Sequence, residues 1–126
     1  MVPSDLRYTK DHEWVRVDGQ EATVGITEYA AGQLGDIVFV ELPESGRHLD
    51  QFAVFGVVES VKAVSDLFAP VSGAVAATND ALAGSPELVN SDPYGEGWMV
   101  RISLSATDEI DDLLDATAYD ALIAAG

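Results

Sequence analysis

Lys62 is the residue in this chain whose position most suggests covalent chemistry. It is one of two lysines, and it is the only lysine or arginine between Arg47 and Arg101. Apolar segments lead into and out of the sequence Glu59-Ser60-Val61-Lys62-Ala63, which predicts a β-hairpin with the lysine at its tip. Such a tip suits a lysine that must enter a modifying enzyme and then carry a prosthetic group between partners. A lone turn lysine is also typical of an ordinary solvated surface residue, and spacing alone leaves both interpretations open.

The residues around Lys62 resemble the lipoylation site of lipoyl domains. An acid lies three positions before the lysine, a hydroxyl residue two positions before it, and an alanine directly after it. Biotin-carrier sites differ because methionines flank their lysine. Other segments, in order and over nearly the whole chain, are similar to the glycine cleavage H-protein family. These segments are residues 8–15 (YTKDHEWV), 25–27 (GIT), 35–38 (GDIV), 42–43 (LP), 70–73 (PVSG) and 90–98 (NSDPYGEGW).

The resemblance implies a fold and a cofactor. The fold would be mostly β, a lipoyl-domain-like barrel–sandwich hybrid with short peripheral helices and a C-terminal helical segment. The cofactor would be lipoate bound covalently to Lys62. Glu59 and Ala63 would be recognised by the attaching enzyme, which would be a lipoate ligase or a lipoyl/octanoyltransferase.

The resemblance also implies a non-catalytic carrier of the glycine cleavage system. The lipoyl arm would take the aminomethyl group of glycine from the glycine decarboxylase (P protein) to the aminomethyltransferase (T protein). The dihydrolipoamide dehydrogenase (L protein) would then reoxidise it. Two alternatives remain open: a lipoyl donor in protein lipoylation with no part in glycine breakdown, and a structural β module with an unmodified lysine.

Two acids are candidates for a cleft that shelters the arm. The aminomethyl cargo ends in an ammonium group, and a carboxylate can hold an ammonium by a charge-assisted hydrogen bond. The family resemblance makes Glu13, in Asp11-His12-Glu13-Trp14, and Asp66, four residues after Lys62, plausible for this role. The alternative is that both are surface acids among the 22 of the chain.

Composition limits the partners. A chain of 126 residues with 48% hydrophobic and 22% charged residues is typical of one globular domain, taken here as residues 1–126. The net charge of −16 makes nucleic acid and anionic membranes poor partners and favours the basic rims of enzymes, although it could serve solubility alone. The absence of cysteine excludes disulfides. No apolar run is long enough to span a membrane, and no leader sequence is recognisable, so we expect a cytoplasmic monomer.

Motifs for catalysis or metal binding are missing from the sequence. The glycines lack the strand–loop–lysine context of a phosphate-binding loop, and no nucleophile elbow is present. His12 and His48 have no second histidine at metal-ligand spacing. We therefore expect neither a catalytic residue nor a metal site.

Short strands separated by turns predict the scaffold that would hold the lysine. Residues 12–17 and 21–25 should form a hairpin around Asp18-Gly19. A short helix from residue 28 to 31 should be capped by Thr27 and ended by Gly35. Residues 36–42 should form a strand buried on both faces, and residues 98–104 a strand with Trp98, Val100, Ile102 and Leu104 inward and Met99, Arg101 and Ser103 outward. The remaining expected elements are strands within 49–60, 64–71 and 74–78, a helical piece near 86–89, a helix from 108 to 115 capped by Thr107, and a last helix that is capped by Thr117 and ends at Ala125.

Overall fold

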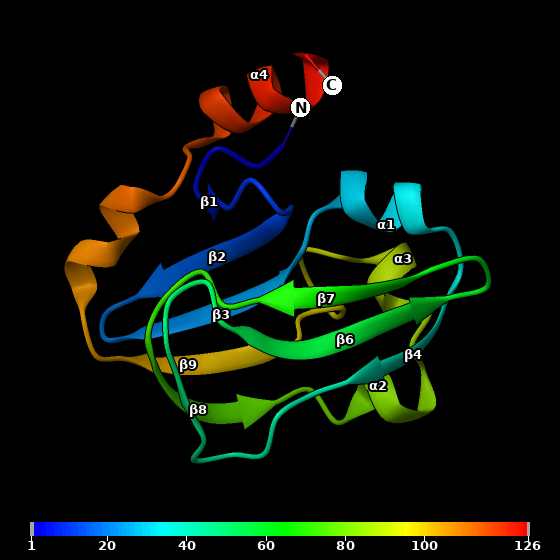
Figure 1. Cartoon of the computed structure of the whole chain (residues 1–126), viewed down its shortest axis with the longest axis horizontal. Coiled ribbons are helices and arrows are strands. Elements are labelled where there is room, and N and C mark those ends of the chain that lie inside the picture. The colour runs from blue at the N-terminus through cyan, green and yellow to red at the C-terminus, as the bar shows by residue number, and fades with distance from the viewer. Residues whose placement is uncertain (1, 126) are drawn as a thin grey trace.

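The computed structural model describes residues 2–125, which form two antiparallel sheets with helices at their edges (Figure 1). The strands are β1 (Arg7–Tyr8), β2 (Glu13–Asp18), β3 (Glu21–Ile26), β4 (Ile37–Glu41), β5 (His48–Leu49), β6 (Val54–Ser60), β7 (Val64–Phe68), β8 (Gly73–Thr78) and β9 (Val100–Leu104). The helices are α1 (Glu28–Leu34), α2 (Ala81–Gly84), α3 (Leu88–Ser91), the 3₁₀ helix η1 (Thr107–Asp112) and α4 (Ala116–Ala125). The prediction of a mostly β fold with short peripheral helices and a C-terminal helical segment is confirmed.

The larger sheet has six strands in the order β1-β2-β3-β9-β8-β5, and the smaller has three in the order β4-β6-β7. The two sheets share one core, because buried side chains such as Val24 and Ile102 of the larger sheet belong to the same cluster as Val58 and Leu67 of the smaller one. Close approach within the smaller sheet depends on Gly56, where a Cβ would come within 2.3 Å of the Glu41 carbonyl oxygen. Strand β6 pairs with β7 on one side and with β4 on the other, and the tip of the β6–β7 hairpin projects from one end of the molecule (Figure 1).

The expectation that residues 36–42 are buried on both faces is wrong. Val38 and Phe39 of β4 are 52% and 49% exposed. The reason is that β4 is an edge strand with one face on the core, and the register shifts between Ile37 and Phe39. Such a bulge places consecutive apolar side chains on the outer face.

The expected alternation along residues 98–104 holds only within β9. Met99 is fully buried, although the alternation placed it outward. Trp98 and Met99 precede the strand: the Trp98 N–H donates to the Gly95 carbonyl in a turn, and the two-residue period starts at Val100.

Helix α1 begins and ends as predicted. The Thr27 side chain accepts a hydrogen bond from the Ala30 N–H at 3.2 Å. The chain turns away at Gly35, whose φ of 83° and ψ of −157° suit glycine. The predicted helical piece near 86–89 is present as α3 but begins at Leu88, and α2 is an additional helix.

The C-terminal segment has different caps from those expected. Thr107 is the first residue of η1 rather than its cap, since Ala106 holds the N-cap position. The Asp115 carboxylate, not Thr117, accepts the Ala118 N–H at 2.8 Å at the start of α4. Helix α4 lies beside β1 (Figure 1), where Tyr119 packs with Leu6, Tyr8 and Trp14 in a second buried cluster. None of the helices within residues 2–125 is long and apolar enough to cross a membrane.

Candidate functional site

Lys62 lies at the tip of the β6–β7 hairpin, as the sequence predicts. The Ser60 N–H donates to the Ala63 carbonyl at 2.8 Å and closes the turn. The Ser60 hydroxyl oxygen accepts the N–H groups of Lys62 at 3.2 Å and Ala63 at 3.0 Å. Val61 is 70% exposed beside the exposed lysine. Ser60 therefore gives the tip a defined backbone conformation while the lysine stays accessible.

The tip is also attached to the loop that joins α1 to β4. The Val61 N–H donates to the Asp36 carbonyl at 3.1 Å. The Lys62 stem lies along Gly35: a Cβ at Gly35 would be 3.4 Å from Lys62 Cε. The lysine stem therefore lies against the end of α1.

The Asn90 side chain holds that loop from the other side. Its carbonyl oxygen accepts the Ile37 N–H at 2.9 Å, and its amide donates to the Gly35 carbonyl at 2.9 Å. Gly35 was predicted only as a helix terminator, and Asn90 only as part of a family-like segment. The role of both residues was missed because their contacts join positions that are distant in the sequence, and residue spacing does not reveal such contacts.

Glu59 and Ala63 flank the lysine as expected. Ala63 is exposed, and Glu59, half-buried near the end of β6, pairs with Val64 of β7 and with Phe39 of β4. A protein that recognises the tip would meet both residues together with the lysine.

A cavity of about 150 Å³ opens beside the lysine stem. Its wall on one side is α1, including Leu34, which directly precedes Gly35. Apolar and polar side chains both line it: Asp11, His12, Ile26, Ala30, Gln33, Leu34, Val58, Ser65, Asp66 and Leu67. We refer to this cavity as the α1–β7 cleft. Its position makes it the natural place for an arm that extends from Lys62.

Asp66 and Glu13 hold different positions relative to this cleft. Asp66 is exposed on β7 and lines the cleft directly. Glu13 is not among the lining residues: it is 1% exposed, and it is next to the lining residue His12 in sequence. Its carboxylate accepts the Thr9 hydroxyl at 2.5 Å and the Phe68 N–H at 3.2 Å.

Burial changes the acidity of Glu13. Desolvation raises the pKa of its carboxyl group from 4.5 to about 7, and the hydrogen bonds from Thr9 and Phe68 oppose that rise. The carboxyl group therefore exchanges a proton near neutral pH. A cation brought close to it would favour the ionised form.

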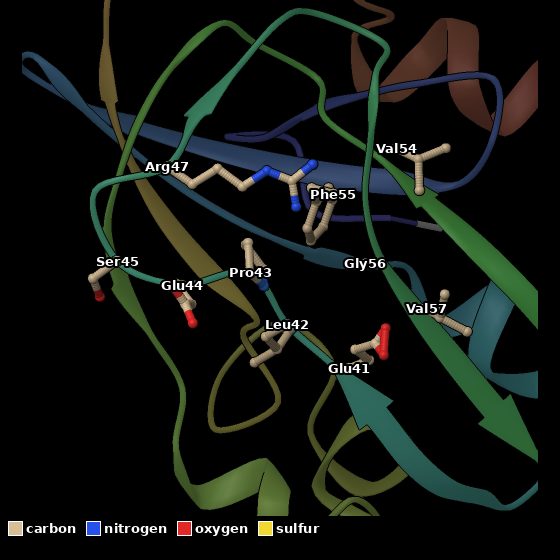
Figure 2. Close-up of a pocket in the computed structure, with 10 residues that line it drawn as sticks. All are labelled: Glu41, Leu42, Pro43, Glu44, Ser45, Arg47, Val54, Phe55, Gly56 and Val57. Carbon is tan, nitrogen blue, oxygen red and sulfur yellow. The ribbon is translucent and has the colours of Figure 1, made fainter.

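A larger cavity of about 650 Å³ lies at the other end of β6 (Figure 2). Its lining includes the first residues of β6 together with Glu41, Glu44 and Arg47. Lys62 comes two residues after the end of β6, and the seven residues of that strand extend about 20 Å. This cavity is open and remote from the lysine, so we do not assign it as the site of the arm, although its volume is larger.

Comparisons with known proteins agree with the geometry. A sequence model described as Glycine cleavage H-protein matches residues 6–125. The chain is 60% identical over 125 residues to the glycine cleavage system H protein of Symbiobacterium thermophilum, covering 99% of this chain and 98% of that protein. It is 58% identical over 123 residues to the protein of the same name from Nitratidesulfovibrio vulgaris, covering 98% of this chain and 95% of that protein.

The crystal structure of a glycine cleavage system H protein from Mycobacterium marinum superposes on this chain with a TM-score of 0.90 at 40% identity. The match covers 98% of this chain and 99% of that one. The predicted resemblance to the lipoyl-domain-like fold of this family is confirmed over the two sheets and the C-terminal helix.

Proposed function

The chain belongs to the glycine cleavage H-protein family, and from that premise we propose that Lys62 is the attachment residue for its lipoyl group. The protein is a lipoyl carrier of the glycine cleavage system, and covalently bound lipoate is its cofactor. Its role in that system entails interaction with the glycine decarboxylase, the aminomethyltransferase and the dihydrolipoamide dehydrogenase. The relatives described above are all named for glycine cleavage, so no observation favours the alternative of a lipoyl donor.

The observation that carries the assignment of Lys62 is its place between an exposed tip and the α1–β7 cleft. The lysine is accessible on a turn ordered by Ser60, and its stem lies against Gly35, the residue that follows Leu34 of the cleft wall. Lys10, the other lysine of the chain, lies in a turn before β2 and far from the lipoyl-like sequence.

The cleft is suited to a lipoyl group. Its apolar members, among them Leu34, Val58 and Leu67, can pack on a hydrocarbon chain, and Asp66 offers a carboxylate to a cationic end. When bound, lipoate would supply a disulfide that is reduced as one sulfur takes up the aminomethyl group, and, once that group has been passed on, a dithiol that the dehydrogenase reoxidises. The residues of this chain hold that group, shelter it from water and offer carboxylates to the ammonium end.

Glu13 would act without lining the cleft. Its buried carboxylate lies next to His12, and a charge close to the cleft attracts an ammonium more strongly where water is excluded. We assign Asp66 to direct contact with the cargo and Glu13 to a supporting charge. Glu59 and Ala63 are assigned to recognition by the lipoate-attaching enzyme.

We further propose that residues 1–126 act as one monomeric carrier domain without catalysis of its own. The hairpin tip, the cleft and both acids all lie on one continuous scaffold. The chemistry of decarboxylation, transfer and reoxidation would then belong to the three partner enzymes.

The attachment site can be tested by intact-mass spectrometry. The unmodified protein is incubated with a lipoate ligase, lipoate and ATP, and Lys62→Arg is treated alongside it. Arginine keeps the positive charge but offers no acylatable amine, so we expect the mass of one lipoyl group on the wild type and none on Lys62→Arg. Lys10→Arg is the matched control and should be modified like the wild type. Lipoate on Lys62→Arg, or its loss in Lys10→Arg, would overturn the assignment.

A further inference from the structure

We propose that His12 binds the sulfur end of the lipoyl arm through its Nε2–H group, and that Tyr119 of the C-terminal helix positions it for this contact. The proposal deepens the function above and rests on it, because it requires the arm to enter the α1–β7 cleft. His12 lines that cleft, and neither its sequence context nor the family resemblance assigned it a role.

The place of His12 corresponds to the far end of a docked arm. The Lys62 stem lies at Gly35, after the last residue of α1, whereas His12 is linked to Thr27, the N-cap of the same helix. Thr27 and Gly35, on either side of α1, are eight positions apart, which is about 12 Å along a helix. An extended chain gains about 1.2 Å per bond, so the roughly eight bonds from the lysine nitrogen to the sulfurs reach about 10 Å. The two lengths agree.

The ring of His12 is held by contacts from distant parts of the chain. Its Nδ1 atom is 2.8 Å from the Tyr119 hydroxyl oxygen, and that oxygen is 2.7 Å from Thr27 Oγ1. Tyr119 and Thr27 are both fully buried. The backbone of His12 has a φ of 74°, and its carbonyl accepts the Thr27 N–H at 3.0 Å. A non-glycine residue held at positive φ indicates that the surroundings fix its orientation.

The direction of these hydrogen bonds determines the tautomer of His12. Thr27 Oγ1 already accepts the Ala30 N–H, and within residues 2–125 the Tyr119 oxygen is the partner to which the buried Thr27 hydroxyl can donate. A buried donor left without a partner is costly, so Thr27 donates to Tyr119 and Tyr119 donates to Nδ1 of His12. The proton of the neutral ring is then on Nε2, which is the nitrogen left for the cleft.

Two kinds of group would then act on the arm at the far end of the cleft. A neutral imidazole N–H donates to sulfur, while Asp66 and Glu13 offer negative charge to the ammonium. Burial lowers the pKa of His12 and helps to keep the ring uncharged, so it does not repel the cationic cargo. The C-terminal helix thereby acts on the cleft without lining it.

The test compares Tyr119→Phe with Tyr8→Phe. Both variants remove one hydroxyl group from the same pair of stacked rings, whose centroids are 4.7 Å apart. The Tyr8 hydroxyl donates to the Pro3 carbonyl and does not contact His12. The pair therefore separates the bond to His12 from general packing of the aromatic cluster.

Nitrogen-15 NMR of the unmodified proteins gives the first readout. We expect the Nε2–H tautomer of His12 in the wild type and in Tyr8→Phe, and a tautomer mixture in Tyr119→Phe. An Nδ1–H tautomer in the wild type, or no change in Tyr119→Phe, would overturn the positioning role.

The lipoylated proteins give the second readout, after intact mass has shown lipoate on Lys62. Lipoylation followed by reduction of the arm should shift the His12 Nε2 resonance. Carbon-13 relaxation of a labelled arm should show the docked-to-free ratio reduced about two- to tenfold in His12→Ala and Tyr119→Phe, as for loss of one hydrogen bond. His12→Gln restores a donor near the Nε2 position and should recover part of the ratio. Lack of lipoate on Lys62 would overturn the assignment of Lys62 under the proposed function, and this inference with it. An unshifted Nε2 resonance, or equal arm mobility in His12→Ala and wild type, overturns the inference alone.

Discussion

The side chain of Lys62 rests on Gly35, so that a Cβ added to Gly35 would lie 3.4 Å from Lys62 Cε. Gly35 therefore has two duties. It ends α1 with a backbone conformation that other residues rarely adopt, and it provides the surface on which the lysine stem rests.

Comparison of Gly35→Ala with Gly46→Ala should separate the backbone role of Gly35 from its contact with the Lys62 stem. Both glycines have positive φ, but nothing lies within 4 Å of a Cβ at Gly46. Each substitution should reduce the free energy of unfolding by about 1–3 kcal/mol through backbone strain. We expect only Gly35→Ala to shift the NMR resonances of the Lys62 side chain and to lower the docked fraction of the arm. Equal effects of the two variants on Lys62 would contradict the contact seen here.

Glu59→Gln should slow lipoylation and leave stability nearly unchanged. The residue is half-buried next to the tip, and substitutions outside packed or capped positions usually alter stability within about ±0.5 kcal/mol. Glu41→Gln, an exposed acid on the neighbouring strand β4, is the control. The measurements are the initial rate of modification by a lipoate ligase and the midpoint of thermal unfolding. A collapsed midpoint with full modification of the folded fraction would make Glu59 a structural acid.

Glu13→Gln should remove a pH dependence of stability. The pKa of Glu13 is about 7 in the fold against 4.5 without it, so the folded state binds the extra proton. The stability from this proton is fully present below pH 4.5 and is lost as the pH rises through about 7. A difference of this size corresponds to about 3 kcal/mol.

Urea denaturation at about pH 5 and about pH 8 measures this effect. The wild type should lose more stability between the two than Glu13→Gln does. Glu21→Gln, which changes an exposed acid at the start of β3, should behave like the wild type. Parallel curves for wild type and Glu13→Gln would show that the buried carboxyl does not titrate in this range.

Asp66→Ala and Glu13→Ala should both weaken protection of the aminomethyl cargo. Asp66 is exposed, and an exposed charge pair contributes up to about 1 kcal/mol, so its loss should lower the docked ratio by up to about fivefold; Glu13 does not line the cleft, and its loss should have a smaller effect. Spontaneous ammonia release from cargo-loaded protein, without the aminomethyltransferase, measures the loss. Asp50→Ala, at an exposed acid between β5 and β6, is the control. Release rates equal to the wild type in both cleft variants would mean that neither acid guards the cargo.

Local sequence chemistry was sufficient to predict the parts of the site that neighbouring residues build. The turn at Lys62 and the start and end of α1 depend on residues within a few positions, such as Ser60, Thr27 and Gly35. The contacts that complete the site join distant positions. Glu13 meets Phe68 across 55 residues, and Tyr119 meets His12 across 107. Periodicity and turn signals carry no information about such pairs.

The misplaced burial along β4 has a related cause. An apolar run predicts a strand enclosed on both faces, but the edge position of β4 and its bulge are properties of the assembled sheet. The same holds for the acidity of Glu13. The family resemblance suggested a carboxylate for the cleft, whereas its burial depends on the packing of β2 near the end of β7, where the Phe68 N–H donates to it.

The burial of Glu13 makes cargo capture an exchange of ions. With its pKa raised to about 7, the carboxyl group carries a proton over part of the neutral pH range. On the role proposed for it, an ammonium that docks in the α1–β7 cleft favours the ionised form of this nearby carboxyl group, so docking releases part of a proton into solvent. Docking should therefore tighten as the pH rises through about 7 and loosen on acidification. Retention of the cargo would thus be coupled to protons, and the pH of the solution would set how tightly the aminomethyl group is held.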